Sequence, residues 1–200
     1  MKTYLLLLRG INVGGRNRVP MADLRVFLEE QGLIDVSTYI QSGNAIARSG
    51  LAASMLSRKL EAGLPRAFRL DSSIIKVLAL TADQLRTIVD ERPEGFGDEP
   101  DTYHSDAIFL MGISTAEAMK VFTPRAGVDE IWPGDGVIYS QRLSALRTRS
   151  RLNRMMASPL YGSMTIRSWK TTTRLLEMVS DADARAADSL GEAGSPAAGP

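Results

Sequence analysis

The sequence predicts an α+β protein made of two tandem ferredoxin-like halves, each of βαββαβ type with a mostly antiparallel sheet. The first observation is that the opening 80 residues follow the strand and helix order of the split βαβ unit. The second is that a similar series follows a segment rich in glycine and proline. A chain of 200 residues, 44% of them hydrophobic, can also bury a sizeable core. The expected divisions are an N-terminal half over 1–90, a linker over 91–103, a C-terminal half over 104–180 and a disordered tail over 181–200.

The elements of the N-terminal half follow from hydrophobic spacing. An apolar run predicts the first strand, and apolar residues three and four positions apart after Pro20 predict a helix. The turn Ser42-Gly43-Asn44 between two short apolar segments predicts a hairpin. The elements are expected over residues 3–9, 20–31, 36–40, 45–48, 51–62 and 73–80.

The C-terminal half is preceded by a helix that begins at the capping box Thr81-Ala82-Asp83-Gln84. A second box of this kind, Ser114-Thr115-Ala116-Glu117, predicts a short helix. The turn Pro133-Gly134-Asp135-Gly136 predicts another hairpin. Strands are expected over 107–111, 129–132, 137–140 and 164–167, and helices over 144–156 and 169–179. The tail is rich in alanine, glycine, proline and acidic residues, and we expect disorder after about Arg185.

The composition excludes several classes of site. The chain has no cysteine, so it has no disulfide, thiolate metal site or cysteine nucleophile. No apolar run approaches the roughly 20 residues that cross a bilayer, so we expect no membrane span. The absence of cysteine is compatible with a reducing cytoplasm, and we expect a cytoplasmic protein. The single histidine, His104, lies beside the acidic linker, where an exposed surface position explains it best. We expect no metal and no cofactor.

Positive charge is concentrated late in the chain. Residues 136–176 carry eight basic and no acidic side chains. In the expected helix over 144–156, Arg147, Arg151 and Arg154 fall on one face, where like charges repel unless an anion compensates them. The segment therefore indicates an anionic partner. The alternative is a solvated helix face that acidic residues from elsewhere balance.

A glycine-rich loop follows the first strand. It runs Arg9-Gly10-Ile11-Asn12-Val13-Gly14-Gly15-Arg16-Asn17. Glycine permits backbone N–H groups to approach an anion, and arginine supplies forked donors for phosphate or carboxylate. The spacing matches neither the dinucleotide fingerprint nor the P-loop. The candidate ligand-binding residues here are Arg9, Asn12, Gly14, Gly15, Arg16 and Asn17. The alternative is a structural loop whose asparagines satisfy backbone groups.

Two further motifs supply the remaining candidates. The segment Tyr39-Ile40-Gln41-Ser42-Gly43-Asn44 places Gln41, Ser42 and Asn44 at a strand end, although such residues often bond only their own turn. The segment Arg167-Ser168-Trp169-Lys170-Thr171 offers Arg167 and Lys170 beside Ser168, which can cap the last helix. A helix N-terminus of this kind suits phosphate.

Together, the motifs at 8–15, 39–44 and 167–171 resemble the DUF1697 family of uncharacterised bacterial proteins. The resemblance covers about residues 1–180 and implies a compact α+β bacterial protein. The family usually has asparagine where this chain has Ser168, and both residues cap helices well. The resemblance brings no activity, substrate or catalytic residue.

Three functions remain open from the sequence. The first is binding of a phosphorylated or carboxylated small molecule between the glycine loop and the late arginines, chiefly Arg147, Arg151 and Arg167. The second is binding of nucleic acid or another polyanion through residues 142–174. The third is a non-catalytic interaction or homodimer role. No catalytic residue or general base is identified, so the sequence does not decide whether the protein is an enzyme.

Overall fold

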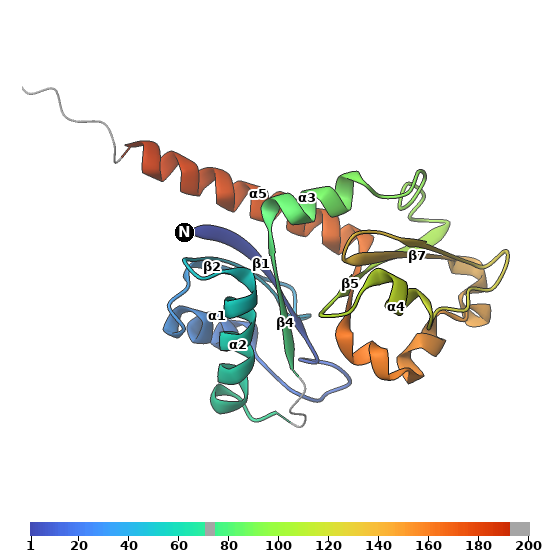
Figure 1. Ribbon diagram of the computed structural model, residues 1–200, viewed down its shortest axis with the longest axis horizontal. Coiled ribbons are helices and arrows are strands. Elements are labelled where there is room, and N and C mark those ends of the chain that lie inside the picture. Colours follow the sequence, from blue (N-terminus) through green and yellow to red (C-terminus); the bar gives the residue numbers. More distant parts are fainter. Residues whose placement is uncertain (71–74, 193–200) are drawn as a thin grey trace, which may run out of the picture.

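The computed structural model describes residues 1–70 and 75–192, with side chains to Asp188. Its fold is mixed α+β, with two antiparallel four-stranded sheets and a long last helix that runs beside the first sheet (Figure 1). The first sheet is formed by strands between residues 2 and 81, and the second by strands between residues 103 and 168. Expected structure over 71–74 and 193–200 lies outside the described residues.

The N-terminal sheet has the strand order β2-β3-β1-β4 and is antiparallel throughout. Its first strand is central because residues 4–8 are apolar at every position, which suits a strand buried on both faces. The capping box at Thr81 forms and starts the helix that leaves the sheet. The elements are β1 (Lys2–Arg9), α1 (Met21–Glu30), β2 (Ile34–Tyr39), β3 (Asn44–Ser49), α2 (Ala53–Ala67), β4 (Lys76–Thr81) and α3 (Ala82–Asp90).

The C-terminal sheet repeats this arrangement with the strand order β6-β7-β5-β8. The capping box at Ser114 forms at the start of its short helix, and the predicted hairpin joins β6 to β7. The elements are β5 (Tyr103–Leu110), α4 (Thr115–Met119), β6 (Asp129–Pro133), β7 (Val137–Leu143), the 3-10 helices η1 (Ser144–Arg149), η2 (Leu152–Ala157) and η3 (Pro159–Ser163), β8 (Met164–Ser168) and α5 (Trp169–Glu192).

Three hydrophobic clusters fill the molecule in layers. The first lies between the N-terminal sheet and helices α1 and α2, and the third lies between the C-terminal sheet, α4 and η2. The middle cluster joins Leu5 and Leu7 of β1 to Phe109 and Tyr139 of the second sheet, with α3 and α5 around them. Because this middle cluster contains residues of both halves, the two halves share it as a common part of the hydrophobic core.

The predicted linker over 91–103 is packed against this core. Phe96 is fully buried and makes edge-to-face contacts with Trp132, Tyr139 and Trp169. Gly97 lies so close to the Trp169 ring that a Cβ would overlap it. The segment therefore contributes to the contact between the halves.

Two expected elements differ from the structure. The helix over 144–156 is replaced by η1 and η2, separated at Ser150 and Arg151, because Asp129 Oδ2 accepts the backbone N–H of Arg151 at 2.9 Å. The tail is helical from 181 to 192 as the end of α5, because four alanines in this stretch favour helix and no glycine interrupts it before residue 191.

Candidate functional site

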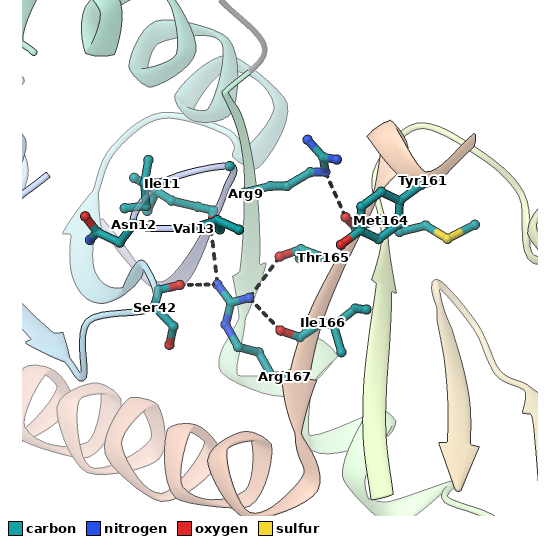
Figure 2. A pocket seen from close by; sticks show the side chains of 12 residues that line it. Arg9, Ile11, Asn12, Val13, Ser42, Tyr161, Met164, Thr165, Ile166 and Arg167 are labelled. Carbon is teal, nitrogen blue, oxygen red and sulfur yellow. Dashed lines mark hydrogen bonds between the residues drawn. The ribbon is translucent and has the colours of Figure 1, made fainter. Parts of the chain in front are cut away.

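The candidate site lies where β8 of the second sheet meets the end of β1 and the β2–β3 hairpin. Strand alternation in β8 directs Arg167 toward the N-terminal half and Ser168 to the opposite face. Arg167 stands opposite Ala107, which belongs to the core shared by the halves. Its side chain thus crosses the contact between them (Figure 2).

Arg167 is buried, with 6% of its surface exposed, and bonds only neutral groups. Nε donates to Asn44 Oδ1, and Nη1 donates to Thr165 Oγ1 at 2.9 Å and to the Ile166 carbonyl at 2.8 Å. Nη2 faces three carbonyls, those of Leu8, Ser42 and Gly43, at 3.2, 2.9 and 3.3 Å. All guanidinium nitrogens are therefore engaged.

The guanidinium keeps its charge in this position. Burial lowers the pKa of Arg167 to about 10, which is still well above neutral pH. Oxygen acceptors around every nitrogen favour the charged form. Among the described residues, Arg167 forms no ion pair with a carboxylate. The positive charge is thus solvated by dipoles and not neutralised.

The β2–β3 hairpin is shaped to receive Arg167. Asn44 is fully buried and donates its amide to the Tyr39 carbonyl at 3.1 Å and to Ser42 Oγ at 3.0 Å, which leaves Oδ1 for Arg167. Gly43 adopts φ +76°, and a Cβ there would lie 2.9 Å from the Leu8 carbonyl oxygen and 3.0 Å from the Ile11 side chain. Glycine is therefore required for the hairpin to approach β1 so closely.

The glycine loop is a small hairpin held by its own asparagines. Gly14 and Gly15, both at positive φ, form the tight turn in which the Arg16 N–H donates to the Val13 carbonyl at 3.0 Å. Asn12 bonds both the N–H and the carbonyl of Val19, and Asn17 donates to the Gly10 carbonyl at 2.7 Å. Asn12, Asn17 and the tight turn are thus explained by the alternative from the sequence, a structural loop whose asparagines satisfy backbone groups. Gly14 and Gly15 are exposed, and a Cβ added at either would meet no residue beyond its chain neighbours within 4 Å.

A cavity of about 280 Å³ opens between the start of this loop and β8 (Figure 2). Arg9, Asn12 and Ser42 line it from the N-terminal half, while Arg167 and Tyr161 line it from the C-terminal half. None of the twelve described residues that line it is acidic. Its local field is therefore positive.

Of the two arginines that line this cavity, Arg9 is the one with N–H donors that are not used in hydrogen bonds to the protein. Its Nε donates to the Met164 carbonyl at 3.1 Å, and its guanidinium carbon lies 5.2 Å from the centre of the Tyr161 ring. Within the described residues, no hydrogen bond engages its two terminal nitrogens. The neighbouring strand places Lys76 beside Arg9, where Lys76 Nζ donates to Ser163 Oγ at 2.9 Å. Both contacts join the halves and hold the cations near the cavity.

The structure brings together part of the predicted site. Arg9, Asn12, Ser42 and Arg167 line the cavity, Asn44 contacts Arg167, and the Gln41 carbonyl accepts from Asn12 at 3.0 Å. Besides Gln41 and Asn44, the predicted residues that do not line it are Gly14, Gly15, Arg16, Asn17, Arg147, Arg151, Ser168 and Lys170.

The structure explains why several of the predicted residues lie away from this cavity. Arg147 and Arg151 are exposed in the region of η1 and η2, so the expected arginine stripe on one helix is absent. Ser168 and Lys170 line a different cavity together with His104. Ser168 Oγ accepts from the Thr171 N–H at 3.2 Å, which is the capping contact that the sequence predicts.

Sequence reasoning missed the C-terminal wall of the cavity. Tyr161, Met164, Thr165 and Ile166 line it, and no local pattern marks any of the four as a site residue. It also missed that His104 Nε2 lies 3.2 Å from Asp106 Oδ1, although residues two apart on a strand share a face. Over the described ranges 1–70 and 75–192, no three His, Asp or Glu side chains gather as metal ligands would. No helix in those ranges could span a bilayer.

Comparison with known proteins identifies the family. The model of DUF1697, described as a protein of unknown function, matches residues 1–139, and the chain belongs to this family. The matched range includes the motifs at 8–15 and 39–44. None of the curated proteins matches the chain. Among solved structures it is similar to the conserved bacterial protein SP0830 from Streptococcus pneumoniae, with 26% identity and a TM-score of 0.74 over 88% of this chain and 98% of that chain.

Proposed function

We propose that this DUF1697 protein is a bacterial cytoplasmic protein that binds a small phosphorylated or carboxylated molecule in the cavity between the glycine loop and β8. The observation that carries the proposal is that Arg9 and Arg167, from different halves, line one cavity with no acidic residue among the described lining. A positive field of this kind favours an anion.

The two arginines have different roles in this proposal. Arg167 has its nitrogens engaged by protein acceptors, so it contributes charge through a low-dielectric wall and not a direct bond. Arg9 has two terminal nitrogens to donate, and its cation–π contact with Tyr161 helps to hold the guanidinium at the cavity. Arg9 is therefore the residue that would contact the anion.

The size of the cavity limits the ligand. A volume of about 280 Å³ lies just below the usual range of roughly 300–1,000 Å³ for small-molecule sites. The apolar Ile11, Val13 and Ile166 surround the polar groups. A compact anion with a short carbon skeleton fits this lining better than a nucleotide.

A thermal-shift assay with inorganic phosphate and small phosphorylated and carboxylated metabolites tests the proposal. A ligand at about one hundred times its Kd stabilises the folded state by about 2.7 kcal/mol, which raises Tm by roughly 5–10 °C for a chain of this length. Arg9→Ala should abolish the shift, and Arg147→Ala, which removes an exposed arginine away from the cavity, should retain it. Absence of any shift, or a shift that survives Arg9→Ala, contradicts the proposal.

A second candidate is polyanion binding through the exposed arginines of the 3-10 region, which are Arg147, Arg149, Arg151 and Arg154. Residues 136–176 contain no carboxylate that could neutralise them locally. Binding of single-stranded RNA or DNA at two salt concentrations separates this candidate from the first. A phosphate-driven complex weakens steeply as salt rises and weakens in Arg147→Ala but not in Arg9→Ala.

We further interpret the two halves as ferredoxin-like units. Both sheets place the first strand of the half between its third and fourth strands. In the second half, three 3-10 helices occupy the position of the second helix.

A further inference from the structure

A second cavity, of about 720 Å³, lies where the segment after Phe96 meets the start of α5. Its aromatic lining comes from Tyr103 and Trp169, and its charged lining comes from Asp101, His104 and Lys170. It shares no described lining residue with the cavity at Arg9. It is therefore a separate candidate site.

The side chain of His104 is oriented by a carboxylate. His104 Nε2 donates to Asp106 Oδ1 at 3.2 Å, and Asp106 Oδ2 lies 3.5 Å from Arg142 Nη2. The Asp106 side chain is 14% exposed, whereas that of His104 is 47% exposed. The carboxylate is thus largely shielded from solvent, whereas about half of the side chain of His104, which lines this cavity, is exposed.

Strand register explains the arrangement. His104 of β5 stands opposite Arg142 of β7, which stands opposite Asp129 of β6. Burial raises the pKa of Asp106, while the positive charges of His104 and Arg142 counteract this change. The nearby Asp129 has its own donors, the backbone N–H groups of Arg125 and Arg151 at 3.0 and 2.9 Å. Arg142 therefore supports the ionised form of Asp106.

This geometry determines which imidazole nitrogen is a base. A hydrogen bond from Nε2–H to Asp106 leaves the lone pair on Nδ1. A base that a buried carboxylate orients in this way is the arrangement that takes a proton from a bound hydroxyl. Lys170 supplies a positive charge in the same cavity for the oxyanion that results.

We infer that this cavity binds a small ligand with a weakly acidic ring hydroxyl, of phenol or enol type, and that His104 Nδ1 accepts its proton. The aromatic lining of Tyr103 and Trp169 suits a planar ring. The proton moves from the ligand oxygen to Nδ1, and the oxyanion stays beside Lys170. Asp106 is a positioning residue because it acts through the imidazole.

The first test uses the fact that the chain has one histidine, so its imidazole nitrogen NMR signals need no assignment. Neutral His104 should show a protonated Nε2 and an unprotonated Nδ1. In Asp106→Asn, the charged acceptor of Nε2–H is replaced by a neutral one, so the fraction of the Nδ1-protonated tautomer should rise. A protonated Nδ1 in the neutral wild-type imidazole, or an unchanged tautomer ratio in Asp106→Asn, overturns the inference.

The second test titrates the full chain with 4-nitrophenol, whose phenolate is yellow. Below the pKa of the free probe, binding to the wild-type protein should increase the phenolate absorption. His104→Gln should reduce the bound phenolate fraction at least tenfold, Lys170→Gln should reduce it less, and the surface variant Arg147→Ala should match the wild type. Absence of probe binding, or equal phenolate signals in wild type and His104→Gln, overturns the inference. Failure of these tests leaves the proposal for the Arg9 cavity unaffected, since the two cavities have separate linings.

Discussion

Arg167 of β8 donates from Nε to Oδ1 of Asn44 in β3, a residue 123 positions earlier in the chain. The bond connects the two motifs that the sequence singles out in different halves. Since the partner is an amide and not a carboxylate, the bond joins the halves without neutralising the guanidinium. One side chain therefore has a structural role and also gives the adjacent cavity its positive field.

Arg167→Ala should destabilise the protein by about 2–4 kcal/mol, because it leaves Asn44 Oδ1 and several buried carbonyls without a donor. The free energy of unfolding in urea measures the effect. Arg147→Ala, an exposed arginine, should stay within about 0.5 kcal/mol of wild type. Equal losses in the two variants would show that Arg167 does not hold the halves together.

Asn44→Asp should weaken anion binding on the order of tenfold, or about 1.4 kcal/mol. The new carboxylate would face Arg167 and cancel the charge behind the cavity, although Asn44 is not among the residues that line it. Calorimetric titration with the best anion from the thermal-shift screen measures the change. An affinity equal to that of wild type would mean that Arg167 adds nothing to the site.

Gly43→Ala should cost more stability than Gly14→Ala. Both glycines have positive φ, so alanine is strained at either position by about 1 kcal/mol. Only at Gly43 does the added Cβ also meet the Leu8 carbonyl and the Ile11 side chain. Urea unfolding of the two variants isolates this steric cost, and equal losses would contradict the close approach of the hairpin to β1.

Tyr139 should make stability depend on pH in the alkaline range. Its hydroxyl donates to the Ile88 carbonyl at 2.6 Å, and burial raises its pKa from 10.0 to about 12. Because the folded pKa is the higher one, this stabilisation is complete below pH 10 and is lost as pH rises from 10 toward 12.

The variant Tyr139→Phe provides the comparison for this prediction. It should be less stable than wild type by about 1 kcal/mol at neutral pH, because the Ile88 carbonyl loses its donor. The difference between the two proteins should shrink above pH 10. A difference that stays constant through pH 12 would contradict burial as the cause.

The strands, hairpins and capping boxes were predictable because their signals are local. The continuous apolar run of β1, the box at Thr81 and the turn before Val137 each specify an element within a few residues. The order of these elements was sufficient to predict an α+β fold with two antiparallel sheets. The family resemblance was confirmed by the match over residues 1–139.

The rest depends on contacts between distant residues. Helical spacing over 144–156 predicts one helix, but Asp129, far along the chain, binds the Arg151 N–H where the two 3-10 helices are separated. The arginines 147, 151 and 167 look alike in sequence, yet only Arg167 is buried, because strand register directs it into the core shared by the halves. No local pattern distinguishes a buried arginine that carbonyls surround from an exposed one.

A crystal structure of the full chain soaked in tungstate, an electron-rich analogue of phosphate, tests the central claim most directly. The account predicts anomalous density in the cavity between the glycine loop and β8, within hydrogen-bond distance of the terminal nitrogens of Arg9. Density found only along the exposed arginines 147–154, or none in a crystal where the cavity is open to solvent, would contradict it.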